Sequence, residues 1–240
     1  MPTSTPTIRR LPLTASVLAA AVLSLGACSG DSGGGASDAS PADVLAAAKK
    51  NFDDTSGVHL TLTSSDLPDG VSALISADGD GTHAPAFKGE IKVAYAGFEP
   101  TVPVVAIDGK TYAQLPLTTG WQTIDPGDYG APDPAALLST DGGFSSLLTA
   151  TTDPERGDQV RGGEDNKQIL TEYTGTIDET AAQAIIPSAT GTFEVTYTID
   201  DDDQLQEMVV TGDFYDKGTS STYTIAFSDY GSTPDITAPK

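Results

Sequence analysis

The residues best suited to chemistry in this chain are two histidines, one cysteine and an acidic run. His59 alternates with the apolar positions of a predicted strand, and His83 falls in a predicted loop; neither belongs to a His-Glu-x-x-His zinc motif. The run Asp200–Asp203 lacks the glycine and glutamate of a calcium-binding loop, so a hairpin turn explains it better. We therefore expect no catalytic residue, no metal site, no cofactor and no enzymatic activity.

The only cysteine, Cys28, ends the run Leu25-Gly26-Ala27-Cys28. Two arginines precede an apolar segment, Leu11–Leu25, in the order of a secretory signal peptide. The run resembles the bacterial lipobox, which implies cleavage before Cys28 and attachment of palmitate-type acyl chains to it. The alternative, an uncleaved transmembrane helix, is disfavoured because the segment is no longer than the roughly 17-residue minimum for a span. We expect residues 1–27 to be a signal peptide, and the protein to be anchored at the outer face of the cytoplasmic membrane.

The charge balance excludes nucleic acids as partners. The 240 residues include 34 acidic and 12 basic side chains, for a formal net charge of −22. Nucleic-acid binding requires clustered Lys and Arg, which this chain lacks. The excess of acidic residues itself is better explained by a salty habitat or by simple solubility than by a particular partner. With one cysteine the chain forms no intramolecular disulfide, so the domain must be stabilised by its own core.

The chain divides into three parts. Residues 1–27 form the predicted signal peptide, residues 28–40 form the lipidated cysteine and a flexible Gly/Ser/Asp tether, and residues 41–240 form one domain. A helix is predicted to start at Pro41, because Ser40 and Asp43 have the spacing of a capping box. Its apolar positions recur at helical spacing and predict one buried face: Val44, Leu45, Ala48 and Phe52.

From Val58 onward the apolar residues alternate, which predicts strands. Turn signals at 68–70, 78–81 and 108–109 are expected to separate the first strands into a meander. A break with short helical pieces at Leu137–Leu138 and Leu147–Leu148 follows from 125 to 158. Further elements are predicted as strands at 168–176, 192–199, 204–214 and 221–229 and a helix at 178–186. The pattern indicates an α+β domain built on one strongly curved antiparallel sheet.

Whether the space beneath this sheet is a cavity or a packed core is left open by the pattern. Small residues alternate with large apolar ones along the predicted strands: Gly89, Ala94, Gly97 and Ala113. Small side chains permit either an unfilled cavity or close packing in an ordinary core.

The mature chain resembles the actinobacterial, mycobacterial-type LppX/LprA/LprF/LprG family of glycolipid-binding lipoproteins. The resemblance covers nearly all of residues 41–238, and its most distinctive segment is Asp128–Leu138. It is also carried by the capped helix, by Trp121, and by the segments Ser56–Leu62, Gly89–Val93 and Val104–Tyr112.

This resemblance implies a half-barrel sheet with helices over its concave face, enclosing a hydrophobic cavity for acyl chains. Ile91 matches a family residue that points into the cavity, and Val93 and Tyr95 follow it on the same face of the strand. Other lining residues are proposed from pattern alone: Leu74, Val105, Leu137, Leu147, Ile185 and Val195.

The resemblance also implies a function and partners. The protein would bind multi-acylated lipids or glycolipids and carry them from the cytoplasmic membrane toward the outer envelope, receiving them from a major-facilitator type exporter. The alternative is an envelope interaction or scaffold lipoprotein of the same fold with a solid core and no transported ligand.

Overall fold

The computed structural model describes residues 39–163, 166–216 and 218–240. Asp38–Lys240 forms one compact unit. The predicted signal peptide, Cys28 and nearly all of the predicted tether lie outside the described residues. Within the described ranges, no helix combines the length and apolarity that a membrane span requires.

The first element is the helix α1, Pro41–Asp54. Its start has the predicted capping box: the Asp43 backbone N–H donates to Ser40 Oγ, and the Ser40 N–H donates to Asp43 Oδ2, both at 3.3 Å. Val44, Leu45, Ala48 and Phe52 are all buried, as the helical spacing predicts.

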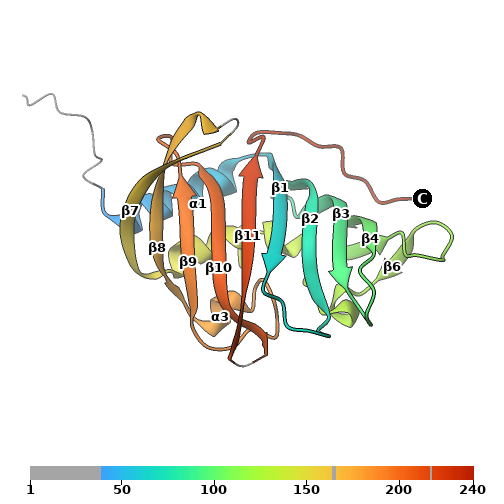
Figure 1. The fold of residues 1–240 in the computed structure, drawn as a ribbon. Helices are drawn as coiled ribbons and strands as arrows, with labels where there is room; N and C mark the ends of the chain where they lie inside the picture. Colours follow the sequence, from blue (N-terminus) through green and yellow to red (C-terminus); the bar gives the residue numbers. More distant parts are fainter. Residues whose placement is uncertain (1–38, 164–165, 217) are drawn as a thin grey trace, which may run out of the picture. The chain divides into compact units, whose positions relative to one another are not determined.

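Eleven antiparallel strands form one open sheet (Figure 1) in the order β6-β5-β4-β3-β2-β1-β11-β10-β9-β8-β7. The strands are β1 Gly57–Ser65, β2 Ala73–Thr82, β3 Ala86–Ala94, β4 Thr101–Ile107, β5 Lys110–Ala113, β6 Gln122–Ile124, β7 Thr152–Gly162, β8 Gln168–Ile177, β9 Phe193–Ile199, β10 Leu205–Asp216 and β11 Thr219–Ser228. Two meanders, β1–β6 and β7–β11, are joined because β1 pairs with β11 over seven positions, from His59↔Ser228 to Ser65↔Thr222. The expected antiparallel α+β architecture is confirmed.

The remaining helices are short: three lie in the predicted break, and the fourth, α3, is shorter than the helix predicted at 178–186. They are η1 Pro126–Tyr129, η2 Ala136–Leu138, α2 Phe144–Ala150 and α3 Glu179–Ala182. Helices α1 and α2 pack together against one face of the sheet, where the rings of Phe52 and Phe144 lie 4.9 and 5.9 Å from that of Phe227 on β11. Figure 1 shows α1 running behind β8–β11.

The predicted turn at Asp78–Gly81 is wrong, because these residues lie inside β2. Asp78 and Asp80 face outward, where His59 Nδ1 lies 2.9 Å from Asp80 Oδ1. The glycines face inward, and a Cβ atom added to Gly81 would lie 2.0 Å from Leu138 Cδ1. Asp and Gly therefore alternate as the outer and inner positions of a strand. The inner positions are glycines because the side chains of Phe87 and Leu138 fill the space above them.

Strand β7 was not predicted, since its first residues fall in the expected break. It carries Pro154, Gly157 and several charges, and most of its residues are exposed. As an edge strand it pairs with β8 alone and contains two register shifts. Proline and charge are tolerated there because one side of the strand has no partner to satisfy.

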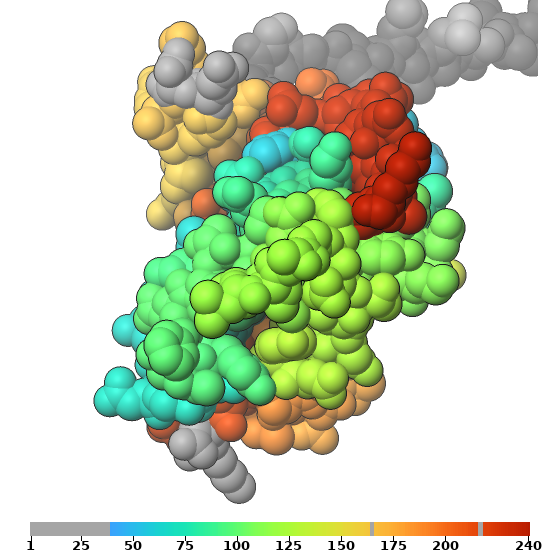
Figure 2. Space-filling view, turned by 90° about the vertical axis from the view of Figure 1, so that its right-hand side faces the viewer, coloured from blue at the N-terminus to red at the C-terminus, as the bar shows by residue number. Residues whose placement is uncertain are grey.

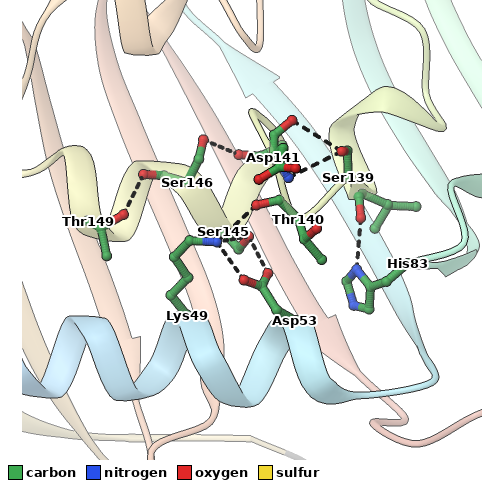
Figure 3. A network of polar contacts seen from close by, with 11 residues as sticks. Lys49, Asp53, His83, Ser139, Thr140, Asp141, Ser145, Ser146 and Thr149 are labelled. Carbon is green, nitrogen blue, oxygen red and sulfur yellow. Dashed lines mark hydrogen bonds and ion pairs between the residues drawn. The ribbon is translucent and has the colours of Figure 1, made fainter.

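A polar network joins α1 to α2 (Figure 3). Lys49 Nζ donates to Asp53 Oδ2 at 2.5 Å, to the carbonyl oxygen of Thr140 at 3.0 Å and to Ser145 Oγ at 3.3 Å. Ser145 Oγ in turn donates to Asp53 Oδ1 at 2.6 Å. Nearby, His83 Nδ1 lies 2.8 Å from the carbonyl oxygen of Leu138. The network holds the two helices together beside the apolar core.

Candidate functional site: an apolar pocket at the β3–β6 end of the sheet

A pocket of about 590 Å³ lies at the end of the sheet formed by β3–β6. Figure 2 views this end, and a hollow is visible between the green segment near residue 100 and the yellow-green segments beyond residue 110. Eighteen residues line it: Ile91, Val93, Tyr95, Phe98, Glu99, Pro100, Val102, Val104, Thr111, Leu115, Pro116, Leu117, Ile124, Pro126, Tyr129, Ala131, Pro132 and Pro134. Glu99 is the only charged residue among them.

Strand alternation sets the sheet wall of the pocket. Ile91 and Val93 on β3 and Val102 and Val104 on β4 share one face, and Ile91 pairs directly with Val102. Lys92 lies between Ile91 and Val93 on the opposite face of β3, and its Nζ donates to Glu99 Oε2 at 2.7 Å. The one charged lining residue therefore has a partner.

The facing wall is the segment 126–134, which contains three of the five prolines in the lining. Proline has no backbone N–H, so it presents apolar ring carbons without an unsatisfied donor. Asp133 positions this wall: its Oδ1 accepts the Ala135 N–H at 3.0 Å and the hydroxyl of Thr111, on β5, at 3.5 Å. Asp125 Oδ1 accepts the Gly127 N–H at 2.9 Å and starts η1 in the same way. The result is an apolar space between sheet and loop.

A second, much smaller pocket of about 30 Å³ lies beside the first. The two share Ile91, Ala131, Pro132 and Pro134. Its other lining residues come from the packed interior: Leu60, Leu62, Leu74, Ala77, Phe87, Leu137 and Phe144. The main pocket thus adjoins the core of the domain through a common apolar wall.

The strand β2 has a bulge between Leu74 and Ser76, next to the smaller pocket. At the bulge, two backbone carbonyl oxygens accept hydrogen bonds from side chains. Tyr223 Oη donates to the carbonyl oxygen of Leu74 and Ser64 Oγ donates to that of Ile75, each at 3.1 Å. Burial raises the pKa of Tyr223 far above its usual value, with the neighbouring Tyr215 adding to the effect. The phenol stays protonated and remains a hydrogen-bond donor.

The structure brings together some of the residues predicted to line a cavity and separates others. Ile91, Val93 and Tyr95 line the main pocket, and Leu74 and Leu137 line the smaller one. Leu147, Ile185 and Val195 are buried in the main core cluster and touch neither pocket. Val105 is buried on the other face of β4, because Val104 and Val105 point in opposite directions.

Gly89 in β3 was one of the small residues that could leave a cavity unfilled, but the space beside it is occupied. Gly89 pairs with Gly79 of β2, and a Cβ atom on either would lie 2.8 Å from Cζ of the Phe87 ring. The ring fills the volume that the glycines vacate. Gly97 lies in the exposed turn between β3 and β4 with a φ of +81°, where glycine is favoured for its backbone freedom.

Most pocket residues were not predicted from the sequence, because they lie in loops: Phe98, Leu115–Leu117 and the proline-rich segment 126–134. A usable signal was present, since the fourteen residues 111–124 carry no charge in a strongly acidic chain. Among the described residues, no group of three or more His, Cys, Asp or Glu side chains is placed to hold a metal ion.

Solved structures share this fold, among them two from mycobacteria. LprF from Mycobacterium bovis superposes with a TM-score of 0.68 at 19% identity, covering 83% of this chain and 96% of LprF. LppX from Mycobacterium tuberculosis superposes with a TM-score of 0.60 at 18% identity, covering 84% of this chain and all (100%) of LppX. No curated protein matches the sequence.

The sequence also matches a family model, that of the LppX_LprAFG lipoproteins, over residues 40–236. The match begins at the cap of α1, includes every strand, and ends in the segment after β11. Because it covers most of the chain, this protein belongs to the LppX_LprAFG lipoprotein family.

Proposed function

We propose that this protein is an envelope lipoprotein that binds the acyl chains of lipids in the pocket at the β3–β6 end of its sheet. The observation that carries the proposal is the lining of that pocket: eighteen residues, of which one is charged and is paired with Lys92. Its volume, about 590 Å³, falls within the range of ligand sites. The membership of the chain in a lipoprotein family supports the same proposal.

Transfer thermodynamics explains how such a pocket would work. Each methylene that leaves water for an apolar pocket gains about 0.8 kcal/mol. A methylene that leaves a bilayer gains almost nothing, since both environments are apolar. Exchange between pocket and membrane is therefore reversible, whereas release into water is strongly disfavoured.

Attachment through Cys28 would keep the domain at the membrane that supplies the lipid. Two or three acyl chains anchor a protein far more firmly than one. In the full proposal the ligand is a multi-acylated lipid or glycolipid, it moves toward the outer envelope, and a major-facilitator type exporter delivers it at the outer face of the cytoplasmic membrane. These finer points extend the proposal beyond lipid binding, and each needs a test of its own.

Native mass spectrometry of the folded unit tests the central claim. Asp38–Lys240 carries the whole sheet and core, so it can be produced without the N-terminal residues. We expect lipid with acyl chains to co-purify under mild conditions, or to bind when supplied in detergent. A protein that stays free of lipid by both routes would instead support the alternative, an interaction or scaffold lipoprotein.

A further inference from the structure

The exposed apolar surface of the domain is concentrated at the mouth of the pocket. Among the described residues, four large hydrophobic side chains are exposed: Tyr95 at 42%, Phe98 at 73%, Leu117 at 107% and Ile169 at 39%. The first three line the pocket and are called here the apolar rim. Ile169 lies in β8, near the other end of the sheet. Exposed apolar groups clustered at one site mark an interaction surface, whereas isolated ones do not.

The backbone holds the apolar rim out from the domain at two tight turns. Tyr95 and Phe98 exchange two backbone hydrogen bonds of 2.9 Å around Ala96 and Gly97, both of which have positive φ. This is the two-residue hairpin that matches strand twist. It places two of the rim side chains at the tip of the β3–β4 hairpin.

The second turn, Leu115–Thr118, is unusual in its third residue. The Thr118 N–H donates to the carbonyl oxygen of Leu115 at 3.2 Å, Pro116 takes the second position, and Leu117 takes the third with a φ of +65°. Glycine or asparagine is the ordinary residue there, because a branched side chain is strained in the left-handed region. Here a leucine occupies it with its side chain fully in solvent. The backbone conformation therefore disfavours leucine at position 117, and the side chain packs against nothing within the described part of the domain. A contact with a partner would explain why a leucine stands there.

The charge around the rim indicates the kind of partner. Residues 93–98 and 111–124 contain no charged side chain, although the whole chain has a net charge of −22. Glu99 is paired with Lys92. An acidic domain is repelled by anionic lipid headgroups, and these two uncharged segments are where that repulsion is weakest. The carboxylates of Asp125, Asp128 and Asp133 belong to the pocket wall and not to the apolar rim. Tyrosine and tryptophan favour the boundary between water and acyl chains, and Tyr95, Tyr129 and Trp121 belong to this end of the domain.

We propose that the apolar rim docks on the lipid bilayer, inserting Phe98 and Leu117 among the acyl chains so that the pocket mouth opens onto the membrane. The inference rests on the proposed lipid-binding function and adds the route of entry. A lipid tail that moved from an undocked membrane to the pocket would cross water, at about 0.8 kcal/mol per methylene. With the rim inserted, the tail passes from one apolar environment to another.

Trp121, the only tryptophan, follows the Leu115–Thr118 turn and serves as a native reporter of docking. The folded unit Asp38–Lys240 is mixed with phosphatidylcholine vesicles that contain brominated lipid, which quenches tryptophan fluorescence on contact. We expect quenching by the wild-type protein without added ligand. Raising the ionic strength should not abolish it, because the contact is apolar.

The test variants are Leu117→Asn and the double variant Phe98→Thr/Leu117→Asn. Asparagine tolerates positive φ, so Leu117→Asn removes the apolar side chain without adding backbone strain. Ile169→Thr is the matched control, since it removes an exposed apolar side chain remote from the pocket. We expect the double variant to lose the quenching and to take up a fluorescent phospholipid from vesicles about tenfold more slowly or worse, while the control behaves as wild type.

The outcomes separate this inference from the proposed function. If wild type takes up lipid but Trp121 is not quenched, or the rim variants take it up at the wild-type rate, bilayer docking is wrong and the binding function stands. If neither vesicles nor detergent load the wild-type protein, the binding function itself fails. If the rim variants instead dissociate a dimer of the folded unit, detected by sedimentation, the rim is a contact between copies and docking is likewise wrong.

Discussion

The Ser145 hydroxyl donates a hydrogen bond to Asp53 across the interface between α2 and α1, with 2.6 Å between Oγ and Oδ1. Ser145 is 1% exposed, and Asp53 is also bound by Lys49. A buried hydrogen bond to a charged group contributes about 1.5–3 kcal/mol to stability. We expect Ser145→Ala to lower the free energy of unfolding by about that amount, measured by urea denaturation. Thr149→Ala, on the exposed side of α2, should change it little; equal effects would show that the network does not join the helices.

Ile91 lines both pockets and is the position at which the lipid-binding proposal is most sharply tested. Ile91→Trp adds a large ring to the open space, so the protein should remain folded and lose bound lipid. In a packed core the same change would cost about 1–3 kcal/mol of stability. Glu90→Trp is the control, because the adjacent side chain lies on the exposed face of β3. Melting temperature and lipid content are measured on the same sample, and a destabilised Ile91→Trp from a wild type that carried no lipid would contradict the proposal.

Gly89 has no room for a side chain. A Cβ atom there would lie 2.2 Å from the carbonyl oxygen of Asp78, which belongs to the neighbouring strand and cannot move freely. We expect Gly89→Ala to destabilise the domain by about 1–3 kcal/mol. Gly157→Ala on the edge strand β7, where the nearest atom would be 3.3 Å away, should be nearly neutral. The comparison uses thermal unfolding, and a neutral Gly89→Ala would show that β2 and β3 are less closely paired.

Glu207 gives a pH-dependent prediction. Partial burial, and secondarily the carboxylate of Glu172, raise its pKa above the usual value. Both glutamates pair with Thr198 of the strand between them. The folded state then binds this proton more tightly than the unfolded state, so stability falls as pH rises from the ordinary carboxyl pKa through the raised one. We expect Glu207→Gln to raise the melting temperature at pH 7 and to have no such effect at a pH below both values.

Glu155→Gln serves as the control for this pH series, because Glu155 is exposed on the edge strand β7. Its difference from wild type should vary little between the two pH values. An advantage of Glu207→Gln that persisted undiminished in acid would contradict the ionisation argument.

Cys28→Ala tests the predicted membrane anchor. The cysteine is the only one in the chain, and its thiol is the proposed site of acylation. We expect metabolic labelling with a radioactive fatty acid to mark the wild-type protein and to leave the variant unmarked. Replacing Ser24, just before the lipobox, with alanine should preserve the label. Acylation of the Cys28→Ala protein would show that another residue carries the lipid.

Local elements were predictable where each depended on short-range chemistry. The start of α1 follows from Ser40, Pro41 and Asp43, whose side chains and ring act on backbone groups within one turn. The turn at Asp200–Asp203 is similarly self-contained, because Asp200 Oδ1 accepts the N–H groups of Asp202 and Gln204 at 3.0 and 2.9 Å. Alternation placed Ile91 and Val93 on one face of β3, and both line the pocket.

Predictions failed where distant residues decide the outcome. Asp78–Gly81 has the composition of a turn, yet it is a strand because Phe87 and Leu138 occupy the space above its glycines. Val105 and Val195 have the alternation of lining residues, but one lies on the opposite face of β4 and the other lies deep in the core.

The sequence by itself determined the class of fold, the acidic character of the domain and the face of most strands, because these depend on composition and on periods of two or 3.6 residues. The anchor at Cys28 stays a prediction from the sequence. Only the tertiary structure decided where the pocket lies. It forms between β3–β6 and the loop 126–134, and its apolar rim combines Phe98 with Leu117, nineteen positions apart in the chain. Such a space depends on how loops pack over a sheet, and no local pattern encodes which inward-facing positions remain unfilled.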